Sequence, residues 1–142
     1  MSIRIELATS ARSQMVDITG QVSRALEQAG VRGDGVAHLF CPHTTAGLLV
    51  NEGADPDVAR DILAHLERLV PWEGPWRHAE GNAAAHVRAS LVGSSVWVPL
   101  EAGRLQLGRW QSIFFCEFDG PRRRTVWIEV VPAAPREPAT RP

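Results

Sequence analysis

The sequence predicts an α+β domain. Segments in which apolar and polar residues alternate, typical of half-buried strands, lie near both ends of the chain, and helical periodicity dominates the middle. The 142 residues are enough for one domain with a hydrophobic core. An apolar fraction of 44% and a charged fraction of 22% are typical of an ordinary globular protein.

The first third of the chain predicts a strand, a helix and a second strand. Residues 3–7 alternate between apolar and charged side chains, as in a half-buried strand. Asp17 is a candidate N-cap for a helix that should end at Gly30. Residues 36–41 are apolar on both faces apart from His38, which predicts a central strand covered on both sides, with His38 in the core.

The middle of the chain predicts two further helices. Residues 47–50 are expected to continue the preceding strand. Asp55 can cap a helix that carries a single apolar stripe. Residues 71–76 form a loop with two prolines and two tryptophans, which should pack on another element or form a lid. Asn82 can cap a helix that ends at Gly93.

The last third of the chain predicts strands again. Residues 96–107 alternate around a short turn, as in a β-hairpin, and 110–118 and 125–131 are two more strands. The predicted domain therefore spans residues 1–131. Residues 132–142 are rich in proline and are expected to be disordered.

Composition disfavours several classes of protein. No run of about 18 apolar residues occurs, so no membrane-spanning helix is expected. The N-terminus lacks the apolar stretch of a signal peptide, which predicts a cytoplasmic protein. A formal net charge of -1 argues against a general nucleic-acid binder, because such proteins usually carry a large positive excess. Cys41 and Cys116 lie in apolar runs and are expected to be buried, reduced thiols.

Three histidines are candidate metal ligands: His43, His78 and His86. Neutral imidazole is a common ligand of borderline metals, and three such ligands with one open coordination position form a reactive site. His78 and His86 flank Asn82, the expected helix cap, where a phosphate or carboxylate would be favoured. The alternatives are a turn histidine bonded to the backbone at 43, and two surface histidines at 78 and 86.

Charged side chains near these histidines are further candidates. Glu52 follows a strand end and is either a general base for a metal-bound water or an ordinary surface acid. Glu117 has apolar neighbours and needs a partner if it is buried. One of the arginines at 122–124 can supply that partner, or can grip a phosphate together with Arg109. A solvated turn with one structural ion pair is the alternative.

A set of short motifs occurs in a fixed order along the chain. They are Asp17-Ile18-Thr19, His43-Thr44-Thr45-Ala46, Asn51-Glu52, Asp55-Pro56-Asp57-Val58, Glu80-Gly81-Asn82, Ala85-His86, Leu107-Gly108-Arg109-Trp110-Gln111 and Glu117-Phe118-Asp119-Gly120-Pro121-Arg122. Any one motif is weakly specific, whereas the ordered set is highly specific. Together they resemble the YjbQ-type family, described as secondary thiamine-phosphate synthases, over nearly the whole chain.

The resemblance implies a small α+β protein with mixed or antiparallel sheets that assembles as a homotrimer. It also implies a metal site near subunit boundaries and thiamine-phosphate synthase activity. That reaction joins a pyrimidine methyl diphosphate to a thiazole phosphate and releases diphosphate. The chain departs from the family pattern at Arg109, where threonine is common, and at Trp76, where tyrosine is common.

Taken with the resemblance, the predicted site has three groups of residues. The metal ligands are His43, His78 and His86; the catalytic residues are Glu52, Gln111 and Glu117; and the substrate contacts are Thr44, Thr45, Asn82, Arg109 and Arg122. Imidazole ligands favour zinc, and magnesium is the alternative with a diphosphate substrate.

Three functional hypotheses follow. The first is a transferase with secondary thiamine-phosphate synthase activity on phosphorylated small molecules. The second is a metal-dependent hydrolase of a phosphorylated metabolite, because a three-histidine zinc site with an open position also suits activation of water. The third is a non-catalytic trimer that binds metal or ligand. No nucleic acid or membrane is expected as a partner.

Overall fold

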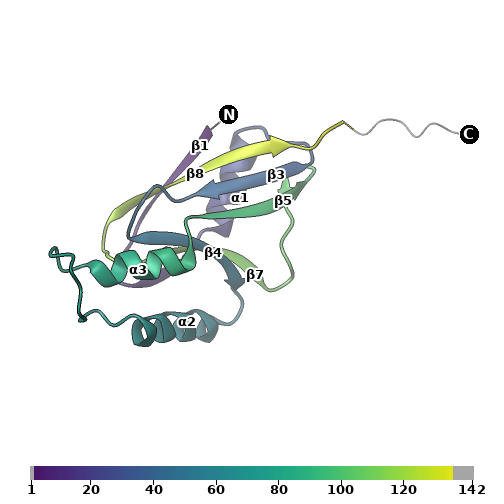
Figure 1. Ribbon diagram of the computed structural model, residues 1–142. Helices are drawn as coiled ribbons and strands as arrows, with labels where there is room; N and C mark the ends of the chain where they lie inside the picture. Colours follow the sequence, from purple (N-terminus) through teal and green to yellow (C-terminus); the bar gives the residue numbers. More distant parts are fainter. Residues whose placement is uncertain (1, 136–142) are drawn as a thin grey trace, which may run out of the picture.

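Within residues 2–135, which the computed structural model describes, the chain folds into eight strands and three helices (Figure 1). The strands are β1 (Ser2–Ala8), β2 (Gln14–Asp17), β3 (Gly35–Phe40), β4 (Ala46–Glu52), β5 (Ser95–Glu101), β6 (Arg104–Leu105), β7 (Gln111–Glu117) and β8 (Arg123–Pro132). The helices are α1 (Thr19–Gln28), α2 (Pro56–Leu69) and α3 (Ala83–Val92). The prediction of an α+β domain with three helices is confirmed.

Two sheets carry the strands. The larger has the order β1-β8-β3-β5-β6, and the smaller has the order β2-β7-β4. Neighbouring strands are antiparallel in both sheets. In Figure 1, α1 lies behind the larger sheet, while α3 and α2 lie on the opposite side of the molecule, near β4 and β7. Helix α3 packs against β4, which brings the predicted histidine segment to the smaller sheet.

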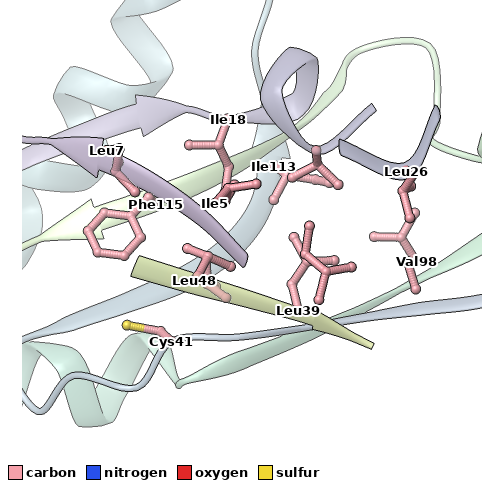
Figure 2. Close-up of a cluster of buried hydrophobic side chains, with 14 of the residues drawn as sticks. Ile5, Leu7, Ile18, Leu26, Leu39, Cys41, Leu48, Val98, Ile113 and Phe115 are labelled. Atoms are coloured by element: carbon pink, nitrogen blue, oxygen red, sulfur yellow. The ribbon is translucent and has the colours of Figure 1, made fainter. Parts of the chain in front are cut away.

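The main hydrophobic core lies between the two sheets and α1 (Figure 2). Alternate residues of each contributing strand point into it, as the period of two in an extended chain requires. Helix α1 adds Val22 and Leu26, which lie one turn apart on its buried face. The strands contribute Ile5, Leu7, Ala37, Leu39, Leu48, Val98, Leu100, Ile113, Phe115, Val126 and Ile128.

A second core joins α3 to the smaller sheet. Its buried members are Ala85, Ala89, Phe114, Cys116 and Phe118. Helix α3 buries small side chains, so its backbone can approach β4 closely. The approach is tightest at Gly47 of β4, because a Cβ there would collide with the main-chain oxygen of Gly93 at the end of α3.

The prediction that residues 47–50 continue the preceding strand is wrong. Those residues belong to β4, which lies in the smaller sheet, whereas β3 lies in the larger one. Residues 41–45 carry the chain from one sheet to the other. The apolar runs on both sides of this link look alike in sequence because both strands contribute to the same core.

The prediction that the strand over 36–41 is covered on both sides, with His38 in the core, is also wrong. One face of β3 is buried through Ala37 and Leu39, while His38 is only partly buried. Its ring stacks on Trp97 with a centroid distance of 4.2 Å, and 60% of Trp97 is exposed. Aromatic contacts on the outer face of the sheet thus explain the apolar sequence of this strand.

The aromatic loop over 71–76 packs as predicted. Trp72 lies between two guanidinium groups, with Arg12 at 4.3 Å and Arg88 at 5.7 Å from its ring. Arg88 is buried and donates from Nε and Nη2 to the main-chain oxygen of Val70, at 3.1 and 2.9 Å. These bonds fix the end of α2, where the loop begins, to α3.

The ends of the chain and its thiols complete the fold. Strand β8 runs one residue into the proline-rich segment predicted over 132–142, and residues 136–142 of that segment lie outside the described residues. Cys41 and Cys116 are buried free thiols, as predicted, and burial raises the pKa of Cys116 to about 12. No helix within residues 2–135 has the length and apolar character needed to cross a membrane.

Candidate functional site

The loop before α3 and the first turn of that helix bring two of the predicted ligands together. The rings of His78 and His86 are T-shaped, with centroids 5.1 Å apart. They share a pocket of ≈ 310 Å³ with Trp76, Arg77 and Val87. In a tetrahedral zinc site with Zn–N bonds of about 2.1 Å, two imidazole centroids lie roughly 5.2 Å apart. The spacing of the two rings is compatible with two ligands of one zinc ion, and His78 Nε2 lies 3.7 Å from Glu80 Oε2.

His43, the third predicted ligand, is held differently. Its Nε2 accepts a hydrogen bond of 3.0 Å from the main-chain N–H of Thr125 in β8. Burial, followed by the nearby Arg124 guanidinium, lowers the pKa of His43. A neutral imidazole that accepts at Nε2 carries its proton on Nδ1, so neither nitrogen offers a free lone pair in this arrangement.

A groove of ≈ 430 Å³ connects His43 with His86. Thr44, Ser90 and Ser94 also line it, which gives the groove several hydroxyl groups. His86 lines both this groove and the pocket with His78. Within residues 2–135, however, no three histidine, cysteine, aspartate or glutamate side chains are grouped to hold a metal ion. The three-histidine metal site therefore stays a prediction.

A buried ion pair contacts Thr45, which lies between the groove residues Thr44 and Ala46. Glu117 is fully buried, and its carboxylate pairs with Arg124, which donates from Nε and Nη2. Thr9 Oγ1 donates to Glu117 at 2.7 Å, and the main-chain N–H groups of the next two residues donate at 3.1 and 3.2 Å. Arg124 Nη2 also donates to Thr45 Oγ1 at 2.9 Å.

This network gives structural roles to two predicted site residues. Burial on its own raises the pKa of Glu117, but the hydrogen bonds from Arg124 and Thr9 outweigh it, so the pKa is lowered. Glu117 is therefore a charged, fully bonded group, in the arrangement expected of a positioning residue. Thr45 is buried against Arg124, whereas Thr44 is exposed in the groove. The prediction that an arginine after the turn pairs with Glu117 is confirmed, with Arg124 as the partner.

Asn82 and Arg122 meet at a second polar contact beside the histidine pair. Asn82 Nδ2 and Arg122 Nη2 both donate to Asp119 Oδ2, each at 2.9 Å. Asn82 holds the N-cap position of α3, but its side chain makes no capping bond, contrary to the prediction. Its Oδ1 is buried without a hydrogen-bond partner in the described chain.

Glu52, Gln111 and Arg109 lie far from the histidines in the same chain. The register of β4 with β7 pairs Ala46 with Glu117 at one end and Glu52 with Gln111 at the other. At roughly 3.4 Å per residue, the two ends lie about 20 Å apart. Gln111 Oε1 accepts from the Gly108 N–H at 2.8 Å. Arg109 lies 4.7 Å from the exposed Trp110 ring.

Sequence reasoning missed Thr9 and Asp119 as members of these networks. No local motif marks Thr9, which lies more than a hundred positions from Glu117 in sequence. Asp119 lies next to Gly120-Pro121, a sequence typical of a turn, and only its tertiary contact with Asn82 shows a second role.

Comparisons with known proteins agree with the fold. A family model described as "UPF0047 protein YjbQ-like" matches residues 3–133. The UPF0047 protein YugU of Bacillus subtilis is 49% identical over 128 residues, covering 89% of this chain and 96% of YugU. The UPF0047 protein MJ1081 of Methanocaldococcus jannaschii is 43% identical over 131 residues, covering 92% of this chain and 94% of that protein.

Solved structures are similar over the same region. The crystal structure of an uncharacterized YjbQ/UPF0047-family protein from Clostridium acetobutylicum has a TM-score of 0.87 and 51% identity, and covers 91% of this chain and 99% of that one. The hypothetical protein APE1520 of Aeropyrum pernix has a TM-score of 0.88 and 37% identity, and covers 94% of this chain and 99% of that one.

Proposed function

This chain belongs to the YjbQ-like UPF0047 family, and from that premise we propose that it is an enzyme of phosphorylated small molecules, with thiamine-phosphate synthase as a secondary activity. The observation that carries the proposal is the position of His86. It pairs with His78 at a spacing that suits a divalent metal, and it lines the groove of His43. The reaction is therefore assigned to the groove around the first turn of α3.

Several residues around His86 suit a phosphate. The N-terminus of α3 carries the positive end of a helix dipole, and Arg77 lines the adjoining pocket. The hydroxyls of Thr44 and Ser94 can donate to phosphate oxygens in the groove, whereas the Ser90 hydroxyl donates to the main-chain oxygen of His86 at 2.8 Å. His43 presents a neutral ring whose Nδ1–H is free of partners in the described chain, so it can donate to a substrate oxygen.

A metal held by His78 and His86 would neutralise the charge of a departing diphosphate or activate a water molecule. The two imidazoles favour zinc over magnesium, since magnesium prefers oxygen ligands. His43 would join them as a ligand only after releasing the Thr125 N–H. Because an imidazole-bound zinc ion naturally activates water, hydrolysis of a phosphorylated metabolite is the second candidate reaction.

We also propose that the chain acts as a homotrimer in the cytoplasm, with the histidine groove near a subunit boundary. Apolar side chains gather beside the histidines: Val87 and Leu91 lie one turn apart on α3, and Trp76 lies in the preceding loop. Their exposed fractions are 36%, 57% and 36%. Such a patch next to a site is typical of a surface that another protein covers.

The test is a zinc titration of the full chain against a chromophoric chelator, followed by assays for release of diphosphate and phosphate. His78→Ala and His86→Ala should weaken zinc binding at least about tenfold and should abolish turnover. His65→Ala is the matched control, because His65 is exposed on α2, lines neither the pocket of His78 nor the groove of His43, and lies 3.5 Å from Arg68. If both histidine variants keep zinc and turnover, the proposed site is wrong.

A further inference from the structure

A second cleft, of ≈ 350 Å³, lies between β2 and α2 and contains none of the histidines. Its apolar lining includes Met15 of β2, Leu63 of α2 and Phe114 of β7. Three acids, Asp17, Glu52 and Asp55, and one cation, Arg60, line it as well. The cleft therefore combines an apolar surface with negative charge, at the end of β4 remote from His43.

Glu52 points to a missing ligand in this cleft. Its Oε2 atom is shielded from solvent and has no hydrogen-bond partner in the described chain. A carboxylate oxygen withdrawn from water destabilises the protein unless a donor meets it. Oε1 of the same carboxylate also lacks a hydrogen-bond partner in the described chain but is open to solvent, so a ligand in the cleft can reach the carboxylate through Oε1.

The neighbouring polar groups leave this requirement unmet. Gln14 makes two hydrogen bonds with Ser10, and Ser13 accepts from Arg88 and keeps its own hydroxyl proton, but neither donates to Glu52 in the described chain. Arg60 also lines the cleft, and its Nη1 donates to the exposed Asp57 at 2.7 Å.

The two remaining acids add acceptors and no donors. Asp17 and Asp55 each use one carboxylate oxygen to accept a main-chain N–H, at 3.0 and 2.9 Å. The second oxygen of each has no hydrogen-bond partner in the described chain, and because both residues are exposed, water or a ligand can meet it. Among the described residues, the one buried polar side-chain atom of the cleft without a partner is thus a carboxylate oxygen, and carboxylates outnumber cations among the lining residues by three to one.

We propose that this cleft binds the ammonium group of a small organic amine, with Glu52 as the main contact and Asp17 as a second. The hydrocarbon part of the amine packs on Met15, Leu63 and Phe114. A metal ion fits less well, because residues 2–135 hold no group of three ligating side chains and the cleft is lined by apolar surface. The assignment uses no residue of the histidine groove, so it stands independently of the proposed reaction.

The probe is benzylamine, titrated into the full-length protein and followed through amide chemical shifts, with benzyl alcohol as a neutral ligand of the same shape. Benzylamine should shift the amides around Glu52 and Leu63, and benzyl alcohol should bind at least about tenfold more weakly. Glu52→Gln should weaken benzylamine binding by about the same factor. Asp61→Asn, an exposed acid of α2 outside the cleft, should leave it unchanged.

The proposal is overturned by equal affinity for the amine and the alcohol, or by unchanged amine binding in Glu52→Gln. It is also overturned if calcium or zinc displaces benzylamine from these amides and itself depends on Glu52. Should Glu52→Gln fail to fold, Asp17→Asn replaces it, with weaker amine binding supporting the proposal and unchanged binding refuting it.

Discussion

Replacing Arg124 with methionine should destabilise the protein, because it leaves the buried carboxylate of Glu117 without its cationic partner. Arg124 is 6% exposed and supplies both guanidinium hydrogen bonds to Glu117, which is fully buried. Removing one partner of a buried ion pair typically costs about 3–5 kcal/mol. Thr9 and two main-chain N–H groups still donate to Glu117, so we expect the lower end, about 3 kcal/mol.

The assay is urea unfolding at one protein concentration, with Arg123→Met as the control. Arg123 precedes Arg124 on β8 and is exposed, so its replacement should change the free energy of unfolding by less than about 0.5 kcal/mol. If Arg124→Met loses less than about 1 kcal/mol, or no more than the control loses, the ion pair does not carry the stability assigned to it.

The same variant should respond to pH in a defined direction. In the wild type the pKa of Glu117 is lower in the folded protein than in the unfolded chain, where it is roughly 4.3. Ionised Glu117 therefore stabilises the fold above that pH, and this stabilisation is lost as the pH falls through the pKa of the folded protein. Without Arg124, burial favours protonated Glu117, and protonation removes the stranded charge. The penalty of Arg124→Met should therefore be smaller at about pH 5 than at pH 7, and an equal penalty at both would contradict this account.

Two further predictions concern α3. Gly47→Ala should cost about 1–3 kcal/mol in urea unfolding because its Cβ meets the oxygen of Gly93, whereas Gly33→Ala, in open space, should be nearly neutral; equal effects would refute the close approach. Leu91→Glu should convert the proposed trimer into smaller species in sedimentation velocity, because it places a charge in the apolar patch. A monomeric wild type would contradict the trimer.

The elements of the fold were largely predictable because their signals are local. The strand over 3–7, the helix capped by Asp55 and the helix ending at Gly93 follow from periodicity and capping chemistry, and the structure contains each of them. The division of the strands between two sheets was not predictable, because residues 47–50 have the same apolar character in either sheet.

The sequence predicted which site residues lie together only where they are close in sequence and no extended strand separates them. His78 and His86 converge because a single helix start separates them. His43 and Glu52 are also close in sequence, yet the intervening strand is extended and carries them to opposite ends. The burial of Arg124 could have been predicted from the period of two along a strand. Arg124, Val126 and Ile128 are alternate residues of β8, so their side chains lie on the same, inward face of the sheet.

The hydrogen bond from the main-chain N–H of Thr125 to His43 Nε2 determines which ring nitrogen of His43 carries the proton. The tautomer is therefore set by the backbone of β8. A main-chain donor survives every substitution at position 125 except proline, so the side chain there can vary without altering which imidazole nitrogen bears hydrogen. Residue 125 also directly follows Arg124, whose guanidinium is anchored in the interior. Breaking the bond between Arg124 and Glu117 would therefore shift the Thr125 N–H and weaken its hydrogen bond to His43. The ring nitrogens of His43 would then be free to bond differently, although no residue of the groove had been replaced.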